Sequence, residues 1–219
     1  MNRYLTHTPS FHKIISTFTK SRFLKFDHIA TRTFNPNCYH NYLTDTGYKK
    51  MDDTFNFPKF NAFATWYKSE KIIPRVFLSS YLPIIYDKNI TDSNKINYFL
   101  NNPSKLTFQD YKDIQKENQY LAWTLLFDNH INHLALELHN IEQFTEDLQK
   151  HNFVLNNPEN PIKVSADGGL KQVSIIADKI LYSFKDGKYI VPYSFVEFVE
   201  RTRDGFEENN AKDIFNSTK

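Results

Sequence analysis

The stretch Asn132-His133-Leu134-Ala135-Leu136-Glu137-Leu138 decides the fold class of this 219-residue chain. Apolar residues alternate along it, so that three leucines share one face of a strand while His133 lies on the other. Residues 141–150 follow with apolar side chains at helical spacing. A half-buried strand followed by an amphipathic helix predicts an α+β fold, in which helices flank a curved antiparallel or mixed sheet.

The other elements follow from apolar periodicity and turn residues on either side of this stretch. Alternation predicts strands over residues 23–34, 75–80, 170–176 and 189–202, and Asp186-Gly187 indicates a hairpin turn before the last of them. Helices are expected over residues 10–19 and, after a capping box of Thr107 and Asp110, up to Phe127. Residues 37–74 are expected to form loops and short elements, and residues 206–215 a short closing helix. One domain is expected over residues 1–219, with its β-module at residues 23–216.

Composition argues against several functional classes. The formal net charge is only +2 and no basic patch stands out, which argues against a nucleic-acid partner. No apolar run approaches the roughly 20 residues that a membrane-spanning helix needs. Cys38 is the only cysteine, so a metal here must be held by nitrogen and oxygen ligands. The acid-free first 26 residues are compatible with a mitochondrial transit segment, but the helical spacing within residues 10–19 favours a packed helix and a cytoplasmic protein.

His28 is the first candidate for a functional residue. It lies in a predicted strand whose alternation places Phe26, His28 and Arg32 on one face. Four residues of strand separate the ring of His28 from the guanidinium of Arg32 by roughly 13 Å, and an arginine that leans back shortens this to about the length of a small dicarboxylate. A core histidine beside a surface arginine would show the same spacing.

His133 and Glu197 are the other two candidates. His133 points away from the leucines of its own strand, whereas its rival His130 falls in a turn region. Glu197 has apolar neighbours on both faces of its strand, so its carboxylate must be paired, protonated or bound to a metal. A salt bridge to Arg201 would also satisfy it, and Glu200 could be the buried carboxylate instead.

Two neutral imidazoles and one carboxylate have a chemical meaning when they meet at one site. They form the facial ligand set that binds Fe(II) and leaves about three coordination positions open for substrate and O2. The three residues lie far apart in the sequence and form no local motif.

Several segments resemble the 2-oxoadipate dioxygenase/decarboxylase family, which has a glyoxalase-like, or vicinal oxygen chelate, fold. The segments that carry the resemblance are Asp27–Phe34, Pro74–Ser79, Ala122–Leu125, Asn132–Leu136, Leu170–Ser174 and Val196–Arg201. The blocks around His133 and Glu197, with Gly205-Phe206 and Asp213–Phe215, are also similar to 4-hydroxyphenylpyruvate dioxygenases. That second resemblance selects Glu197 over Glu200 and His133 over His130.

The resemblance implies a half-barrel with flanking helices and a set of site residues. It implies that His28, His133 and Glu197 hold Fe(II), that Arg32 grips a substrate carboxylate, and that Gln172 and Ser174 line the pocket. The implied reaction uses O2 to convert a 2-oxo acid, 2-oxoadipate, into 2-hydroxyglutarate and CO2. Residues 37–70 match nothing in the family, and we expect them to influence substrate choice.

Two alternatives remain at this stage. A glyoxalase-like site that holds Zn²⁺, Ni²⁺ or Mn²⁺ would isomerise or hydrolyse a small molecule without O2. A non-catalytic module would use the same aromatic-rich interior to bind a small ligand.

Overall fold

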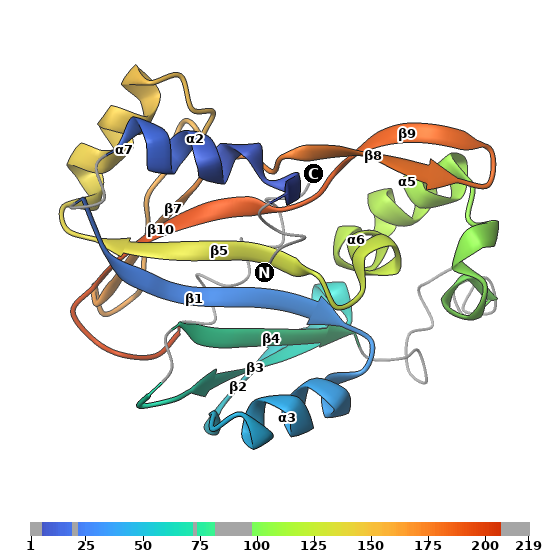
Figure 1. Ribbon diagram of the computed structural model, residues 1–219, viewed down its shortest axis with the longest axis horizontal. Helices are drawn as coiled ribbons and strands as arrows, with labels where there is room; N and C mark the ends of the chain where they lie inside the picture. The colour runs from blue at the N-terminus through green and yellow to red at the C-terminus, as the bar shows by residue number, and fades with distance from the viewer. Residues whose placement is uncertain (1–5, 19–21, 72–73, 82–97, 207–219) are drawn as a thin grey trace.

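The computed structural model describes residues 6–18, 22–71, 74–81 and 98–206. Its main feature is an eight-stranded sheet with the order β2-β3-β4-β1-β5-β10-β7-β6 (Figure 1). The strands of this sheet are β1 (Phe23–Thr33), β2 (Lys49–Phe57), β3 (Ala62–Lys68), β4 (Arg75–Tyr81), β5 (Ile131–Leu138), β6 (Lys163–Val164), β7 (Leu170–Ser174) and β10 (Phe195–Arg201). The strands β8 (Lys179–Phe184) and β9 (Gly187–Pro192) form a separate hairpin.

The sheet consists of two halves with the same connectivity. β1 and β5 pair antiparallel at its centre, β4 runs parallel to β1, and β10 runs parallel to β5. A helix follows the first strand of each half: α3 (Pro36–Asp45) after β1 and α7 (Ile141–Lys150) after β5. The predicted glyoxalase-like class, a curled mixed sheet with flanking helices, is confirmed.

α3 packs against β2 and β4, and the other helices lie at two further places beside this sheet. α2 (Pro9–Thr17) and α7 lie together over β5, β10 and β7 (Figure 1), and they bury the leucines of β5 together with Val196 and Phe198. α5 (Phe108–Glu117) and α6 (Gln119–Phe127) lie at the other end beside the β8-β9 hairpin (Figure 1). All nine residues of α6 are buried, so this helix lies inside the hydrophobic core and has no solvent-exposed face. Among the described residues, no helix is long and apolar enough to cross a membrane.

The segment expected to form loops and short elements is more regular than that. Its described part, up to residue 71, forms α3, β2, the short 3-10 helix η2 (Pro58–Phe60) and β3, so the short elements are present and they leave little loop between them. The side chain of Asn35 caps α3 by accepting a hydrogen bond from the backbone of Cys38. β2 is an edge strand in which only Phe55 and Phe57 are buried, and its exposed first part therefore lacks the alternation that predicts a strand.

Two long elements are interrupted. The helix expected up to Phe127 breaks at Asn118, whose extended backbone ends α5 and whose side chain accepts a hydrogen bond from Leu121 to begin α6. The strand expected over residues 189–202 is divided between β9 and β10, which belong to different sheets. The strand expected over residues 170–176 ends at Ser174. The closing helix expected after Phe206 falls on residues 207–215, outside the described part of the chain.

Candidate metal centre

His28, His133 and Glu197 meet on three neighbouring strands, β1, β5 and β10. The Nε2 atoms of the two histidines lie 3.1 Å apart, and Nε2 of His28 lies 3.6 Å from Oε1 of Glu197. One ligand atom from each residue falls within 4.8 Å of the others. Ala135 pairs in register with both His28 and Glu197, and its methyl group leaves room between them. All three side chains are buried, so their donor atoms face one another rather than water.

A β-bulge orients His28. Phe26 pairs with Leu136, and His28 pairs with Ala135, which is adjacent to Leu136 on β5. Asp27 therefore has no partner on β5 and is an extra residue on β1. Phe26 therefore turns to the helical side, where its ring stacks on Phe11 of α2. The prediction that Phe26 shares a face with His28 is wrong, because strict alternation does not continue through a bulge.

A second bulge, on β5, orients His133. Ala30 pairs with His133 and Thr31 pairs with Ile131, which leaves Asn132 as the extra residue. Each histidine is thus preceded by a bulged polar residue. This arrangement brings a side-chain oxygen beside the Nδ1 atom of each imidazole.

These oxygens determine which ring nitrogen faces the site. Nδ1 of His28 donates to Asp27 at 2.7 Å, and Nδ1 of His133 donates to the side-chain oxygen of Asn132 at 3.2 Å. With the proton on Nδ1, the lone pair of each Nε2 points toward the other ring. Two lone pairs at 3.1 Å repel each other unless a cation lies between them, so the donor set fits a divalent metal ion.

The ionisation of the ligands agrees with this arrangement. Burial, with smaller contributions from the charges of His28 and Arg32, holds the pKa of His133 well below its usual value, so this imidazole is neutral near pH 7. Burial raises the pKa of Glu197, although His28, Gln172 and Lys163 oppose the shift. A metal ion would replace the proton that this buried carboxylate favours.

Arg32 is a buried cation and not a surface arginine. Its side chain is 1% exposed, and its guanidinium lies 4.9 Å from the ring centre of Tyr120 and 5.0 Å from that of Trp123. Burial lowers the pKa of Arg32 to about 10, so it remains charged near neutrality. The two rings belong to α6, and they hold a full positive charge beside the histidines.

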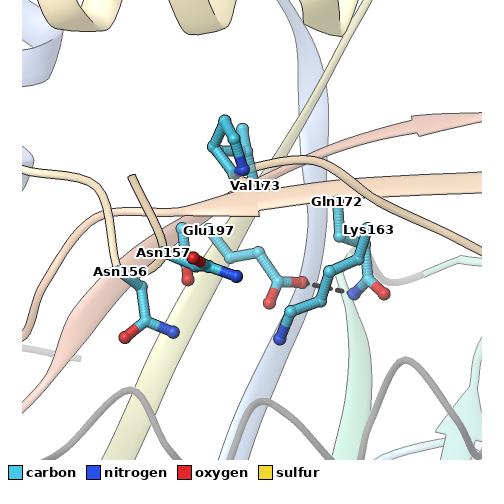
Figure 2. Close-up of a pocket in the computed structure, with 8 residues that line it drawn as sticks. Asn156, Asn157, Lys163, Gln172, Val173 and Glu197 are labelled. Carbon is cyan, nitrogen blue, oxygen red and sulfur yellow. Dashed lines mark hydrogen bonds between the residues drawn. The ribbon is translucent and has the colours of Figure 1, made fainter. Parts of the chain in front are cut away.

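A pocket opens onto the carboxylate of this centre (Figure 2). It is lined by Asn156, Asn157, Pro161, Lys163, Gln172, Val173, Ser174 and Glu197. Gln172 and Ser174, both predicted to line a pocket, lie on β7, and the amide of Gln172 donates to Glu197 at 2.7 Å. Lys163 was not predicted; it pairs with Gln172 across β6 and β7, and it lines the same pocket as Glu197 (Figure 2). A two-residue strand carries no periodic signal that could have found it.

The rival residues have other roles. His130 shares a hydrogen bond of 3.0 Å with the hydroxyl of Tyr193, away from the three converging side chains. Glu200 accepts a hydrogen bond from the backbone of Ile141 at the start of α7. Arg201 does not pair with Glu197; it binds Asp27 through Nε and Nη2, each at 2.8 Å.

Comparisons with known proteins agree with the geometry. The sequence profile of the 2-oxoadipate dioxygenase/decarboxylase family matches residues 87–202. The chloroplastic/amyloplastic 2-oxoadipate dioxygenase/decarboxylase of Oryza sativa subsp. japonica is 30% identical, and the alignment covers 88% of this chain and 69% of that protein.

Two solved structures share the fold. The hydroxyglutarate synthase of Oryza sativa, crystallised in complex with 2-oxoadipate, superposes with a TM-score of 0.83 at 26% identity, over 99% of this chain and 88% of that one. A protein of Ralstonia eutropha described as a glyoxalase superfamily member gives a TM-score of 0.72 at 17% identity, over 92% of this chain and 80% of that one. Because the profile match covers more than half of the chain and the Oryza sativa relative reaches 30% identity, this chain belongs to the 2-oxoadipate dioxygenase/decarboxylase family.

Proposed function

We propose that this protein is an Fe(II)-dependent enzyme that uses O2 to oxidise and decarboxylate 2-oxoadipate. The overall change is 2-oxoadipate plus O2 to 2-hydroxyglutarate plus CO2, in which both atoms of O2 enter 2-hydroxyglutarate, one in its new carboxylate and one in its hydroxyl group, and the CO2 is the former C1 carboxylate of the substrate. The observation that carries the proposal is the convergence of His28, His133 and Glu197 at one buried point in a chain of this family. The hydroxyglutarate synthase crystallised with 2-oxoadipate supports the choice of substrate.

The donor set supports the choice of metal. Nε2 of His28, Nε2 of His133 and the carboxylate of Glu197 would hold the ion, and two nitrogens with one oxygen are the ligands of non-haem Fe(II) oxygenases. When bound, Fe(II) would activate O2 and act as a Lewis acid for the 2-oxo group, while the oxidised substrate supplies the electrons that reduce O2. Zn²⁺, Ni²⁺ or Mn²⁺ would fit the same ligands but would favour non-oxidative chemistry.

The protein's own residues bind and orient the substrate. Arg32 presents a planar fork that matches a carboxylate, and the rings of Tyr120 and Trp123 hold this fork in a dry environment. Lys163 supplies a second positive charge on the pocket side of Glu197. Two cations on different sides of the metal ligands suit a substrate that carries two carboxylates, because each negative charge then has a counter-charge.

Oxygen consumption tests the proposal directly. The protein is purified anaerobically, loaded with Fe(II) and mixed with 2-oxoadipate while dissolved O2 and released CO2 are followed. We expect equal amounts of O2 consumed and CO2 released by the wild type and by His130→Ala, and neither by His133→Ala. The His130 variant is the matched control, since it removes a histidine three residues away that is outside the ligand set.

The other outcomes separate the alternatives. Bound metal without O2 uptake would replace the oxidative reaction by an isomerisation or hydrolysis of the glyoxalase type. O2 uptake with a different 2-oxo acid, but not with 2-oxoadipate, would preserve the reaction and change the substrate. A wild-type protein that binds no divalent metal would leave only a non-catalytic binding role.

The compartment is a separate proposal, and we propose the cytoplasm. The only cysteine, Cys38, is exposed and free, which is compatible with a reducing compartment. Cell fractionation of the full-length protein tests this, and its recovery in an organelle fraction would refute it.

A further inference from the structure

Asp27 is the most heavily bonded carboxylate of the centre, although it is not one of the three candidate ligands. It is fully buried and accepts hydrogen bonds from Nδ1 of His28 at 2.7 Å and from Arg75 at 2.9 Å. Arg201 adds two more at 2.8 Å, one to each carboxylate oxygen. The carboxylate of Asp27 is therefore paired with two guanidinium groups, as expected of an ionised carboxylate in a buried position.

His28 and His133 differ in the group that accepts the hydrogen bond from Nδ1. His28 is held by an ionised carboxylate, whereas the Nδ1 atom of His133 meets the neutral amide of Asn132. The Asn132 amide nitrogen has no hydrogen-bond partner among the described residues. A charged acceptor draws the Nδ1 proton more strongly than an amide does, and this increases the electron density on the opposite ring nitrogen.

Arg201 fixes His28 from a second direction. Besides its fork onto Asp27, it donates to the backbone oxygen of Gly205 and lies 5.1 Å from the ring centre of Phe206. The ring of Phe206 lies edge-on against the ring of His28, with their centres 5.0 Å apart. His28 is therefore held at Nδ1 by Asp27 and on its ring by Phe206, and Arg201 contacts both of these groups.

We propose that Asp27, with its charge retained by Arg201 and Arg75, is a positioning residue that makes His28 the stronger of the two imidazole ligands. Its carboxylate keeps the proton on Nδ1, directs Nε2 to the metal and increases the basicity of that nitrogen. The inference rests on the metal site of the proposed function. Its test therefore measures metal binding and spectroscopy rather than turnover.

The principal variant is Asp27→Asn, with Co²⁺ as the probe. Asparagine preserves the size and an acceptor oxygen, so the variant removes the charge while His28 can remain hydrogen-bonded. We expect the dissociation constant for Co²⁺, measured by competition with a chelator, to rise about 10- to 100-fold, as is usual when such an outer ligand partner is lost. The matched control is Asp204→Asn, which removes a carboxylate from Arg75 without touching His28, and we expect unchanged Co²⁺ affinity.

A second variant covers the case in which Asp27→Asn does not fold because it leaves Arg201 buried without its counter-charge. The double variant Asp27→Asn/Arg201→Gln removes one negative and one positive charge together and leaves the pair of Arg75 and Asp204 intact. We expect the same loss of Co²⁺ affinity in this variant, with a circular dichroism spectrum like that of the wild type.

Proton NMR of the wild-type Co²⁺ protein needs no variant. We expect two exchangeable Nδ1–H signals from the coordinated rings, with the His28 proton further downfield and exchanging more slowly than that of His133. Indistinguishable signals, or wild-type affinity in a folded Asp27 variant, would overturn the inference. A wild-type protein that binds no Co²⁺ would instead refute the metal site of the proposed function.

Discussion

Phe77 occupies in the first half of the sheet the position that Glu197 occupies in the second half. Ala30 lies two residues after His28 and pairs with Phe77 on the parallel neighbour β4. In the same way, Ala135 lies two residues after His133 and pairs with Glu197 on the parallel neighbour β10. Phe77 is buried, and its ring centre lies 5.0 Å from that of Phe206. The repeated fold therefore offers four quasi-equivalent ligand positions, of which three carry donors and the fourth is an apolar wall.

Phe77→Glu should add a fourth protein ligand to the metal centre and leave fewer coordination positions open for substrate and O2. A second carboxylate opposite Glu197 would occupy a coordination position, so we expect Zn²⁺ binding to tighten at least about 10-fold and O2 uptake to fall to the background rate. Because the added charge is buried, the variant should be stable only with metal bound. Phe77→Leu is the control and should preserve uptake. Normal O2 uptake by a folded Phe77→Glu protein would show that this position does not reach the ion.

Arg32→Lys should weaken substrate binding without loss of metal. Lysine retains the charge but loses the planar fork and the contacts with Tyr120 and Trp123. We expect kcat/KM for 2-oxoadipate to fall about 100-fold, mainly through KM, because a buried charge pair is disrupted. Metal content by elemental analysis should equal that of the wild type, and Arg203→Lys, at an exposed ion pair, should behave as the wild type. Loss of iron from Arg32→Lys would contradict a role confined to the substrate.

Lys163→Met should have a smaller and salt-dependent effect. Lys163 is only partly buried, so we expect KM for 2-oxoadipate to rise about fivefold at low salt, equivalent to roughly 1 kcal/mol, and less as the ionic strength increases. Lys171→Met is the matched control, because Lys171 lies on β7, the strand paired with β6, but its amine binds Glu142 of α7. Steady-state kinetics at two salt concentrations measure both variants. Equal effects of the two substitutions would exclude a specific role for Lys163.

His133 should make the metal-free protein less stable in mild acid. Its pKa is lowered in the folded state, so as the pH falls below the unfolded value of 6.5 the unfolded chain takes up a proton that the folded chain refuses. The free energy of unfolding should therefore decrease as the pH falls from 6.5, with a slope of at most about 1.4 kcal/mol per pH unit. Urea denaturation at several pH values measures this slope.

His133→Gln provides the control for that measurement. Glu197 acts in the opposite direction, because its pKa is raised in the folded state and its folded form takes up a proton as the pH falls. The difference between the wild type and His133→Gln isolates the contribution of the imidazole. An identical pH dependence of the two proteins would mean that His133 titrates normally in the folded chain.

Asn118→Ala should affect both stability and substrate binding. The side chain of Asn118 begins α6 and also donates to the backbone of Phe60 at 2.8 Å, so its loss should reduce the free energy of unfolding by about 1 kcal/mol or more. Because α6 carries the rings that hold Arg32, we also expect a higher KM for 2-oxoadipate. Asn102→Ala, at a helix start without a side-chain cap, should be closer to the wild type in thermal denaturation. Wild-type stability of the Asn118 variant would contradict the capping role.

The sequence by itself determined the elements whose side-chain pattern is local. Alternation along residues 131–138 and the helical spacing of residues 141–150 are visible without any partner, since each is a regular pattern of apolar residues within one segment. The residue types also narrowed the chemistry to imidazole and carboxylate ligands, and the family resemblance chose His28, His133 and Glu197 among several possibilities.

Only the tertiary structure decided how these elements pair and what they bury. The bulges at Asp27 and Asn132 are properties of two strands in register, so neither strand alone shows them. Residues 189–202 are split because their two parts pair in different sheets, and the exposed part of β2 is a strand only because β3 pairs with it. Arg32 is buried because rings about ninety positions later in the chain cover it. Periodicity records which face of a segment is apolar, whereas register, bulges and buried charges depend on residues that only folding brings into contact.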